Sequence, residues 1–156
     1  MRVLFICSGN ICRSPMAAGY LLHRVEREGL LDLEVDSAGT LGIRKARASD
    51  GAIEAMAEIG IDITAHRSKG VKSKVLAPTD FTLAMSHDHL DYLALRHPEG
   101  EDERFLLRAF ERGPEPDANP RDLADPIGHP IDFYREQLQM ITSCVDHLVD
   151  YLVRLQ

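Results

Sequence analysis

The sequence predicts a three-layer α/β fold in which a parallel sheet is covered by helices on both faces. Short apolar runs suited to strands alternate along the chain with segments of helical periodicity. Alternation of this kind implies parallel strands joined by right-handed crossovers. The chain has 156 residues, close to the usual domain size, so we expect one domain over residues 1–156.

The expected strands are short and apolar. Residues 3–6 form a continuous apolar run, typical of a strand that is buried on both faces. Three later runs, 33–36, 81–85 and 105–107, are expected to be its partners. Because ligands of such sheets bind at the carboxyl ends of the strands, the residues that follow the first strand are the first candidate site.

The first two helices carry recognisable start and stop signals. One is expected over residues 15–28 and ends at Gly29. The next is expected to run to Glu58, capped by Ser49 or Asp50 and followed by Gly60 as its stop.

Two further helices are expected in the second half of the chain. One covers residues 87–96, after the third strand. The last begins near Ile131 and carries apolar residues at alternating spacings of four and three: Tyr134, Leu138, Ile141, Val145, Leu148, Leu152 and Leu155. This apolar stripe is expected to lie against the sheet.

The loop after the first strand has the composition of a phosphate cradle. Residues 7–14 read Cys-Ser-Gly-Asn-Ile-Cys-Arg-Ser and connect that strand to the first helix. A thiol attacks phosphorus only as thiolate, a form that a helix N-terminus and a guanidinium both favour. Arg13 offers a planar fork that matches two phosphate oxygens. Cys7 is therefore the predicted nucleophile.

The backbone N–H groups of the loop can converge on one anion, as they do where a tight loop enters a helix. These phosphate-binding residues are Ser8, Gly9, Asn10, Ile11, Cys12 and Arg13. A structural cysteine beside an ordinary helix start is the alternative. It would leave the glycine-containing turn and the spacing of Arg13 unexplained.

The run from Val3 to Ala17, with its Cys-five-residues-Arg-Ser signature, resembles the low-molecular-weight protein tyrosine phosphatases. Further similar segments are Asp-Ser-Ala-Gly-Thr at 36–40, Gly-Ile-Asp at 60–62, His-Arg at 66–67 and Asp-Pro at 125–126. The resemblance covers nearly the whole chain. It implies a four-stranded sheet in the order 2-1-3-4 and hydrolysis through a phosphocysteine intermediate, with no metal and no cofactor.

Asp125 is the candidate general acid. A carboxylic acid that protonates the leaving ester oxygen contributes roughly 10²–10⁴ in rate. By sequence alone an Asp-Pro aspartate is equally well explained as a turn residue. The resemblance implies the acid role, because the family's acid occupies the matching Asp-Pro. As a carboxylate, Asp125 could then activate water against the phosphocysteine.

Four polar residues are expected to support the loop. Asn10 tolerates positive φ in a tight turn, and the Ser14 hydroxyl can donate to the thiolate. Ser37 and His66 match positions that the family uses to hold the loop through hydrogen bonds. Without the resemblance, His66 would be interpreted as an ordinary surface histidine.

The expected substrate slot departs from the family pattern. Many members carry aromatic residues after the Asp-Pro and in the loop that follows the second strand. Here those positions hold Ile127, Gly128 and Ile43. An aliphatic wall can still bury a phenyl ring, although it cannot stack on it.

The other two cysteines have different expected roles. The spacing of Cys12 from Cys7 could place both sulfurs within disulfide reach, so that oxidation would mask the nucleophile reversibly. A small buried residue under the loop is an equally good interpretation of Cys12. Cys144 is expected to pack in the core, and a zinc site at Cys7 and Cys12 lacks a second ligand pair.

The expected substrate is a phosphorylated protein or a small aryl phosphate, with inorganic phosphate as the product. A protein arginine phosphatase is the main alternative, but such enzymes carry threonine where this loop has Ile11. A thiol-dependent arsenate reductase would need two further cysteines near residues 78–90, and this chain has none there. An inactive phosphate-binding module should have lost Cys7, Arg13 or Asp125.

The net charge and the cysteine content limit the partners and the compartment that we expect for the protein. The net charge of −7 argues against binding to nucleic acid. No run of about 20 apolar residues predicts membrane insertion, and signal-peptide features are lacking. Three cysteines make no disulfide framework, which favours the cytoplasm.

Two charged clusters have open interpretations. The segment with Arg67, Lys69, Lys72 and Lys74 could attract acidic phosphopeptides or could be a solvated face. Residues 87–89 read His-Asp-His and are expected to be a polar helix start rather than a metal site.

Overall fold

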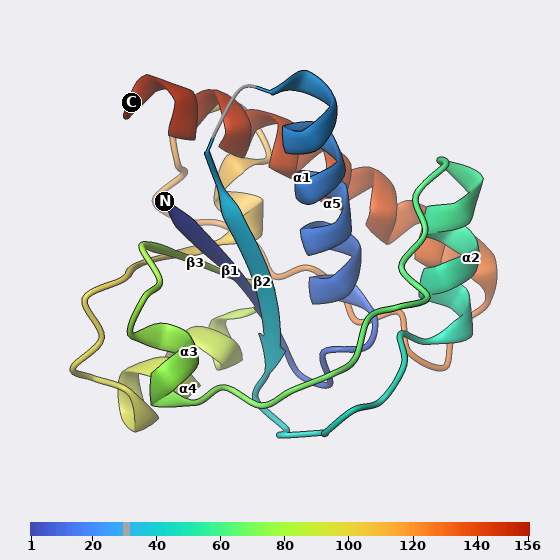
Figure 1. Cartoon of the computed structure of the whole chain (residues 1–156), viewed down its shortest axis with the longest axis horizontal. Helices are drawn as coiled ribbons and strands as arrows, with labels where there is room; N and C mark the ends of the chain where they lie inside the picture. The colour runs from blue at the N-terminus through green and yellow to red at the C-terminus, as the bar shows by residue number, and fades with distance from the viewer. Residues whose placement is uncertain (30–31) are drawn as a thin grey trace.

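A computed structural model describes residues 1–29 and 32–156. Its centre is a parallel four-stranded sheet in the order β2-β1-β3-β4, which confirms the expected fold class (Figure 1). The two central strands are β1 (Arg2–Cys7) and β3 (Phe81–Ala84). The edge strands are β2 (Glu34–Gly39) and β4 (Glu103–Leu106).

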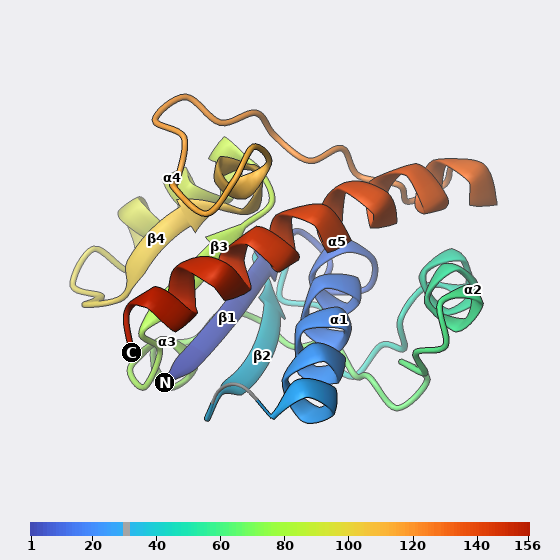
Figure 2. The same cartoon turned by 90° about the horizontal axis from the view of Figure 1, so that it is seen from above.

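Helices cover both faces of the sheet (Figure 2). On one face lie α1 (Arg13–Glu28) and α5 (Ile131–Arg154), and α2 (Asp50–Glu58) packs against both of these helices. The other face is covered by α3 (Ser73–Leu76) and α4 (His87–Arg96). The molecule therefore has three layers.

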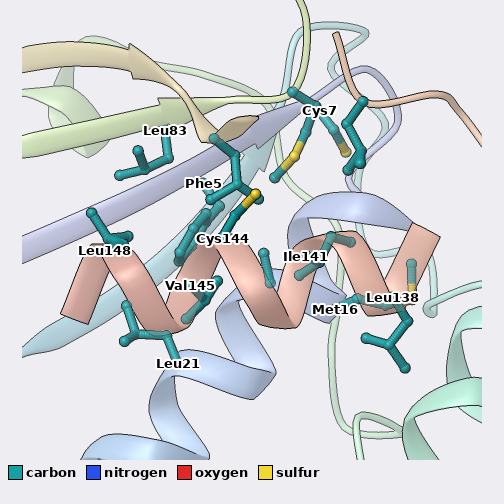
Figure 3. Packing of buried hydrophobic residues seen from close by; sticks show 14 of the residues in the cluster. Phe5, Cys7, Met16, Leu21, Leu83, Leu138, Ile141, Cys144, Val145 and Leu148 are labelled. Carbon is teal, nitrogen blue, oxygen red and sulfur yellow. The ribbon is translucent and has the colours of Figure 1, made fainter. Parts of the chain in front are cut away.

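Alternate residues of β1 supply the two hydrophobic cores. Phe5 points toward α5 and packs with Leu148 and Val145 in one cluster (Figure 3). Leu4 and Ile6 belong to the second cluster, under α3 and α4. This division follows from the period of two along a strand.

The apolar stripe of α5 is buried as expected from Tyr134 to Leu152. Leu155 departs from that pattern, because it lies beyond the last helical residue and is half exposed. Cys144 is fully buried beside Phe5, which confirms its packing role (Figure 3).

Several element boundaries differ from the expected ones. β2 continues to Gly39, three residues beyond the predicted end, because Ser37, Ala38 and Gly39 pair with the last three residues of β1. These small residues have low intrinsic strand propensity, so only the pairing makes them a strand. β4 begins two residues early and gives way at Leu107 to a 3₁₀ turn, η1 (Leu107–Phe110).

The short helix α3 was not expected, since four residues are too few to show a helical period. Within the two described ranges, no helix combines the length and the apolar character required to cross a bilayer.

Candidate active site

The loop of residues 8–12 connects the carboxyl end of β1 to the start of α1, as the sequence predicts (Figure 1). Backbone N–H groups beyond β2 hold it: Thr40 donates to the Cys7 carbonyl at 3.0 Å, and Leu41 donates to that of Ser8 at 3.0 Å. Gly39 lies so close that a Cβ atom there would sit 2.5 Å from the Ser8 carbonyl oxygen. The edge strand β2 thus fixes the position of the loop.

Cys7 is nearly fully buried at the end of β1, where two donors approach its sulfur. The backbone N–H of Asn10 donates to Sγ at 3.2 Å. Ser14 Oγ lies 2.9 Å from Sγ and itself accepts a hydrogen bond from Asn10 Nδ2 at 2.8 Å. The hydroxyl proton of Ser14 is therefore free to point at the sulfur, so both groups can donate a hydrogen bond to Cys7 Sγ.

Asn10 is fully buried and has φ of 57°, the left-handed turn expected for it. Every polar atom of its side chain has a partner: Nδ2 also donates to Ser37 Oγ at 2.9 Å, and Oδ1 accepts from the backbone N–H of Lys69 at 3.0 Å. The structure thus joins Ser14 and Ser37 through one amide, a connection that the sequence analysis did not predict.

His66 contacts the same residue from another segment. Its Nε2 donates to the Asn10 carbonyl at 2.6 Å, because a carbonyl oxygen can only accept. Burial lowers the pKa of His66 from its ordinary value, which keeps the ring neutral with its proton on Nε2. His66 therefore stabilises the turn at Asn10 within the loop.

Arg13 is buried and connects the loop to the segment before α5. Its Nη1 donates to the Leu123 carbonyl at 2.8 Å, and Nη2 lies 3.6 Å from Asp125 Oδ2. The Nε atom is buried and has no hydrogen-bond partner among the described residues. A buried donor without a partner costs about 1–3 kcal/mol, and an anion held by the loop would satisfy it.

A pocket of about 160 Å³ opens over the loop. Its lining combines polar loop residues, four aliphatic side chains and one carboxylate: Cys7, Ser8, Gly9, Ile11, Cys12, Arg13, Leu41, Ile43, Asp125 and Ile127. Asp125 is partly exposed, and its Oδ1 accepts from the Ile127 N–H at 3.1 Å. The pocket therefore has a polar floor, apolar walls and an accessible carboxylate.

Of the residues expected to bind substrate, only Asn10 does not line this pocket. Leu41, by contrast, lines it and was not expected there. The reason is the predicted end of β2, which was placed three residues early and so misplaced the loop that follows. Leu41 directly follows Gly39-Thr40. Had the strand been predicted to end at Gly39, this hydrophobic residue would have stood at the start of the loop beside the active site.

Cys12 is buried under the loop and lies 3.1 Å from Ser49 Oγ and 3.4 Å from the Tyr134 hydroxyl. Burial raises the pKa of the Cys12 thiol above its ordinary value. Cys7 and Cys12 are both free thiols here.

The helix α4 begins at His87, and His87 and Asp88 are exposed, so the expected polar helix start is confirmed for these two residues. His89 departs from it, because it is almost fully buried. Its Nδ1 accepts from the Ser86 N–H at 3.1 Å, so the ring proton sits on Nε2, which lies 2.9 Å from Ser8 Oγ. Ser8 therefore accepts from His89, and its own hydroxyl proton is free for an anion in the pocket. The Ser-x-x-His spacing of a capping box was the available signal.

The protonation of His89 gives a testable pH dependence. Burial, assisted by the Arg13 charge, lowers the pKa of His89 from 6.5 to about 4. The unfolded chain takes up this proton below about pH 6.5 and the folded protein only near pH 4, so stability is lost as the pH falls through that window. We expect unfolding by urea to show a loss of roughly 1–2 kcal/mol from this residue between about pH 7 and pH 5.

The matched variant is His89→Gln, which keeps a donor for Ser8 but cannot titrate. Its unfolding free energy should fall less steeply with decreasing pH than that of the wild type. Equal slopes for the two proteins would show that His89 is not held neutral by its surroundings.

A buried thiol under converging donors, an adjoining guanidinium and a carboxylate at the pocket define the class of cysteine-based phosphatases. The family model described as low molecular weight phosphotyrosine protein phosphatase matches residues 2–156. The chain belongs to this family and is a cysteine-dependent phosphatase.

Named relatives include phosphatases of two substrate classes. A protein-arginine-phosphatase of Geobacillus stearothermophilus is 38% identical over 151 residues, which cover 97% of this chain and 95% of the relative. The crystal structure of a low molecular weight protein tyrosine phosphatase from T. tengcongensis has a TM-score of 0.87 and 35% identity, covering 96% of this chain and 98% of that one.

A second similar structure is a C7S mutant of the YwlE arginine phosphatase with a phosphorylated active-site serine. It has a TM-score of 0.88 and 30% identity, covering 97% of this chain and 95% of that one.

Proposed function

We propose that this phosphatase hydrolyses phosphotyrosine and related aryl phosphate monoesters through a phosphocysteine on Cys7. The observation that carries the proposal is that the pocket floor combines a nucleophile with a buried hydrogen-bond donor. Two groups can donate a hydrogen bond to Cys7 Sγ, and the buried Arg13 Nε has no partner among the described residues. A phosphate group would meet a nucleophile and an unsatisfied donor at once.

In the first step the Cys7 thiolate attacks phosphorus, and the bond from phosphorus to the ester oxygen breaks. Arg13 and the loop N–H groups stabilise the equatorial phosphate oxygens, where charge is spread in the transition state. Asp125, in its acid form, donates a proton to the departing phenolate oxygen. The products are a phenol and a phosphocysteine.

In the second step Asp125, now a carboxylate, accepts a proton from a water molecule. The water oxygen attacks phosphorus and the bond from phosphorus to sulfur breaks. Inorganic phosphate is released and the Cys7 thiolate is regenerated. One residue serves as acid and then as base because the two steps are chemically the reverse of each other.

The walls of the pocket favour an aryl ester over a phosphorylated guanidinium. Ile11, Leu41, Ile43 and Ile127 all line the pocket, and their apolar surfaces can bury a phenyl ring. Ile11 has no hydroxyl to contact a phosphoramidate. The protein-arginine-phosphatase relative nevertheless makes phosphoarginine the second candidate substrate.

A competition experiment distinguishes the two substrates. The reduced enzyme is given one mixture of phosphotyrosine and phosphoarginine peptides, and the loss of each phosphate is followed by mass spectrometry. We expect phosphotyrosine to be lost faster and Ile11→Thr to move the ratio toward phosphoarginine. Faster loss of phosphoarginine by the wild type would overturn the proposed substrate class but keep the cysteine chemistry.

Three further expectations belong to this proposal. We expect residues 1–156 to act as one phosphatase domain in the cytoplasm, where reducing conditions keep the thiols free. We also expect a peroxide to oxidise Cys7 to a sulfenic acid before it reacts with Cys12, because the raised pKa of Cys12 makes that thiol the poorer nucleophile. Attack of the Cys12 thiol on the Cys7 sulfenic acid would form the S–S bond and release water. A disulfide between the two would then protect Cys7 reversibly.

A further inference from the structure

A second pocket, which the proposed chemistry does not use, gathers the lysines of the chain. The sequence contains four lysines, and all four line one cavity of about 330 Å³: Lys45, Lys69, Lys72 and Lys74. Arg44 lines it as well, and no aspartate or glutamate of the described residues does. In a chain with a net charge of −7, this is a strong local reversal of sign.

Most of this positive charge is not neutralised. Lys69 Nζ pairs with Asp36 at 2.6 Å. For Arg44, Lys45, Lys72 and Lys74, the described part of the chain offers no carboxylate oxygen within 4.0 Å. The pocket therefore presents four free cations to a ligand.

The lysine pocket shares a wall with the active site. Leu41 and Ile43 line the active-site pocket, whereas Thr40, Gly42 and Arg44 line the lysine pocket. Neighbouring residues of the loop after β2 thus face the two pockets alternately. A bound chain whose phosphorylated side chain enters one pocket needs only a few residues to reach the other, at about 3.3–3.6 Å per residue.

The frame of the lysine pocket is a backbone ladder between two segments, which run side by side after β2 and before α3 (Figure 1). The Lys45 N–H donates to the Ser68 carbonyl at 2.8 Å, and the Ser68 N–H donates to the Ala46 carbonyl at 2.8 Å. Gly39 and Gly70 form a parallel bridge. The charges therefore project from a defined scaffold.

We propose that the lysine pocket binds acidic side chains that flank the phosphotyrosine in the protein substrate. This inference rests on the proposed phosphotyrosine hydrolysis and specifies the substrates of that same site as acidic proteins. Lysine favours this role because its compact ammonium on a flexible stem can meet carboxylates in many positions, unlike the fixed fork of arginine. A nucleic acid fits less well, since the net negative charge outside this pocket repels a long polyanion.

The test compares two phosphotyrosine peptides that differ only in having glutamate or glutamine at about two to four residues from the phosphotyrosine. We expect kcat/KM of the wild type to be about 3–10-fold higher for the glutamate peptide at low salt. Because these charges are exposed, the preference should shrink strongly at about 0.5 M salt.

Three variants assign that preference to the pocket. In K72Q/K74Q the ratio of kcat/KM for the glutamate peptide to that for the glutamine peptide should fall toward one. K72R/K74R should keep the wild-type ratio. The matched control, R27Q/R112Q, removes the same charge elsewhere and should also retain it. An unchanged ratio in K72Q/K74Q, or an equal fall in the control, would overturn the proposal.

Two measurements separate this proposal from the proposed function. Hydrolysis of p-nitrophenyl phosphate, which is too small to reach the lysine pocket, should be equal in all four proteins. If the wild type hydrolyses neither this compound nor the peptides, the proposed function fails. In that case, binding of acidic side chains in the lysine pocket is tested by titrating the protein with the unphosphorylated peptides and measuring their affinity.

In that titration, the glutamate peptide should bind to the wild type and much less to K72Q/K74Q. Absence of this difference would reject an acidic peptide as the ligand. Tighter lysine-dependent binding of a single-stranded oligonucleotide would likewise reject it, and would assign the pocket to nucleic acid instead.

Discussion

Replacing Cys7 with serine is expected to abolish turnover and to leave phosphate binding intact. A serine hydroxyl is not ionised at neutral pH, so the two hydrogen-bond donors beside it have no anion to act on. The loss in kcat should exceed roughly 10³-fold, as for other nucleophiles that act as a unit with their partners. Any serine phosphate that formed slowly would be a stable ester and would not support turnover.

Binding is the second half of this prediction. Arg13 and the loop N–H groups remain in Cys7→Ser, so calorimetric titration with inorganic phosphate should give an affinity within a few-fold of the wild type. Cys144→Ala is the matched control, since that thiol is buried in the core away from the pocket. Turnover near the wild-type level in Cys7→Ser would contradict the nucleophile assignment.

Replacing Asp125 with alanine should slow phosphotyrosine hydrolysis by roughly 10²–10⁴-fold. The tyrosine oxygen is a poor leaving group unless it is protonated as the ester bond breaks. An aryl phosphate with a strongly acidic phenol leaves without a proton, so its first step should be slowed much less. Single-turnover release of the phenol from both substrates measures this difference.

The control for this experiment is a second carboxylate on the same segment. Asp122 lies 2.8 Å from the His87 N–H and does not line the pocket. Asp122→Asn should therefore keep the wild-type dependence on the leaving group. If Asp125→Ala slowed release from both substrates equally, Asp125 would not be the acid.

Local sequence patterns located the part of the site that is built from neighbouring residues, whereas the family resemblance located distant residues such as Ser37, His66 and Asp125. Cys7, the loop and the start of α1 follow one another along the chain, and the strand–loop–helix pattern predicts their geometry directly. The sheet order, by contrast, was implied only by the resemblance, and the structure confirms it.

The parts that sequence reasoning missed depend on segments far apart in the chain. His89 reaches Ser8 across 81 residues because β1 and β3 are adjacent in the sheet. Leu41 lines the pocket because β2 is lengthened by its pairing with β1. The local signals, a capping-box spacing for His89 and a hydrophobic residue after Gly39-Thr40 for Leu41, do not show which distant residues are contacted, since both contacts arise from the register between strands.

The lysine pocket is a similar case. The basic character of residues 67–74 was visible in the sequence, but its meaning as a binding site or a solvated face was open. Bringing Lys45 to the same cavity requires the ladder between residues 39–46 and 68–71. Tertiary pairing thus converts a charged segment into a concave site.

Detection of the phosphocysteine would test the proposed phosphoryl transfer to Cys7 most directly. Asp125→Ala lacks the base for the second step, so an aryl phosphate with an acidic phenol should load the enzyme faster than water can release the phosphate. Rapid quenching followed by peptide mass mapping should then find one phosphoryl group per chain, on Cys7. A burst of phenol with no phosphorylated peptide, or a phosphoryl group on another residue, would contradict phosphoryl transfer to Cys7.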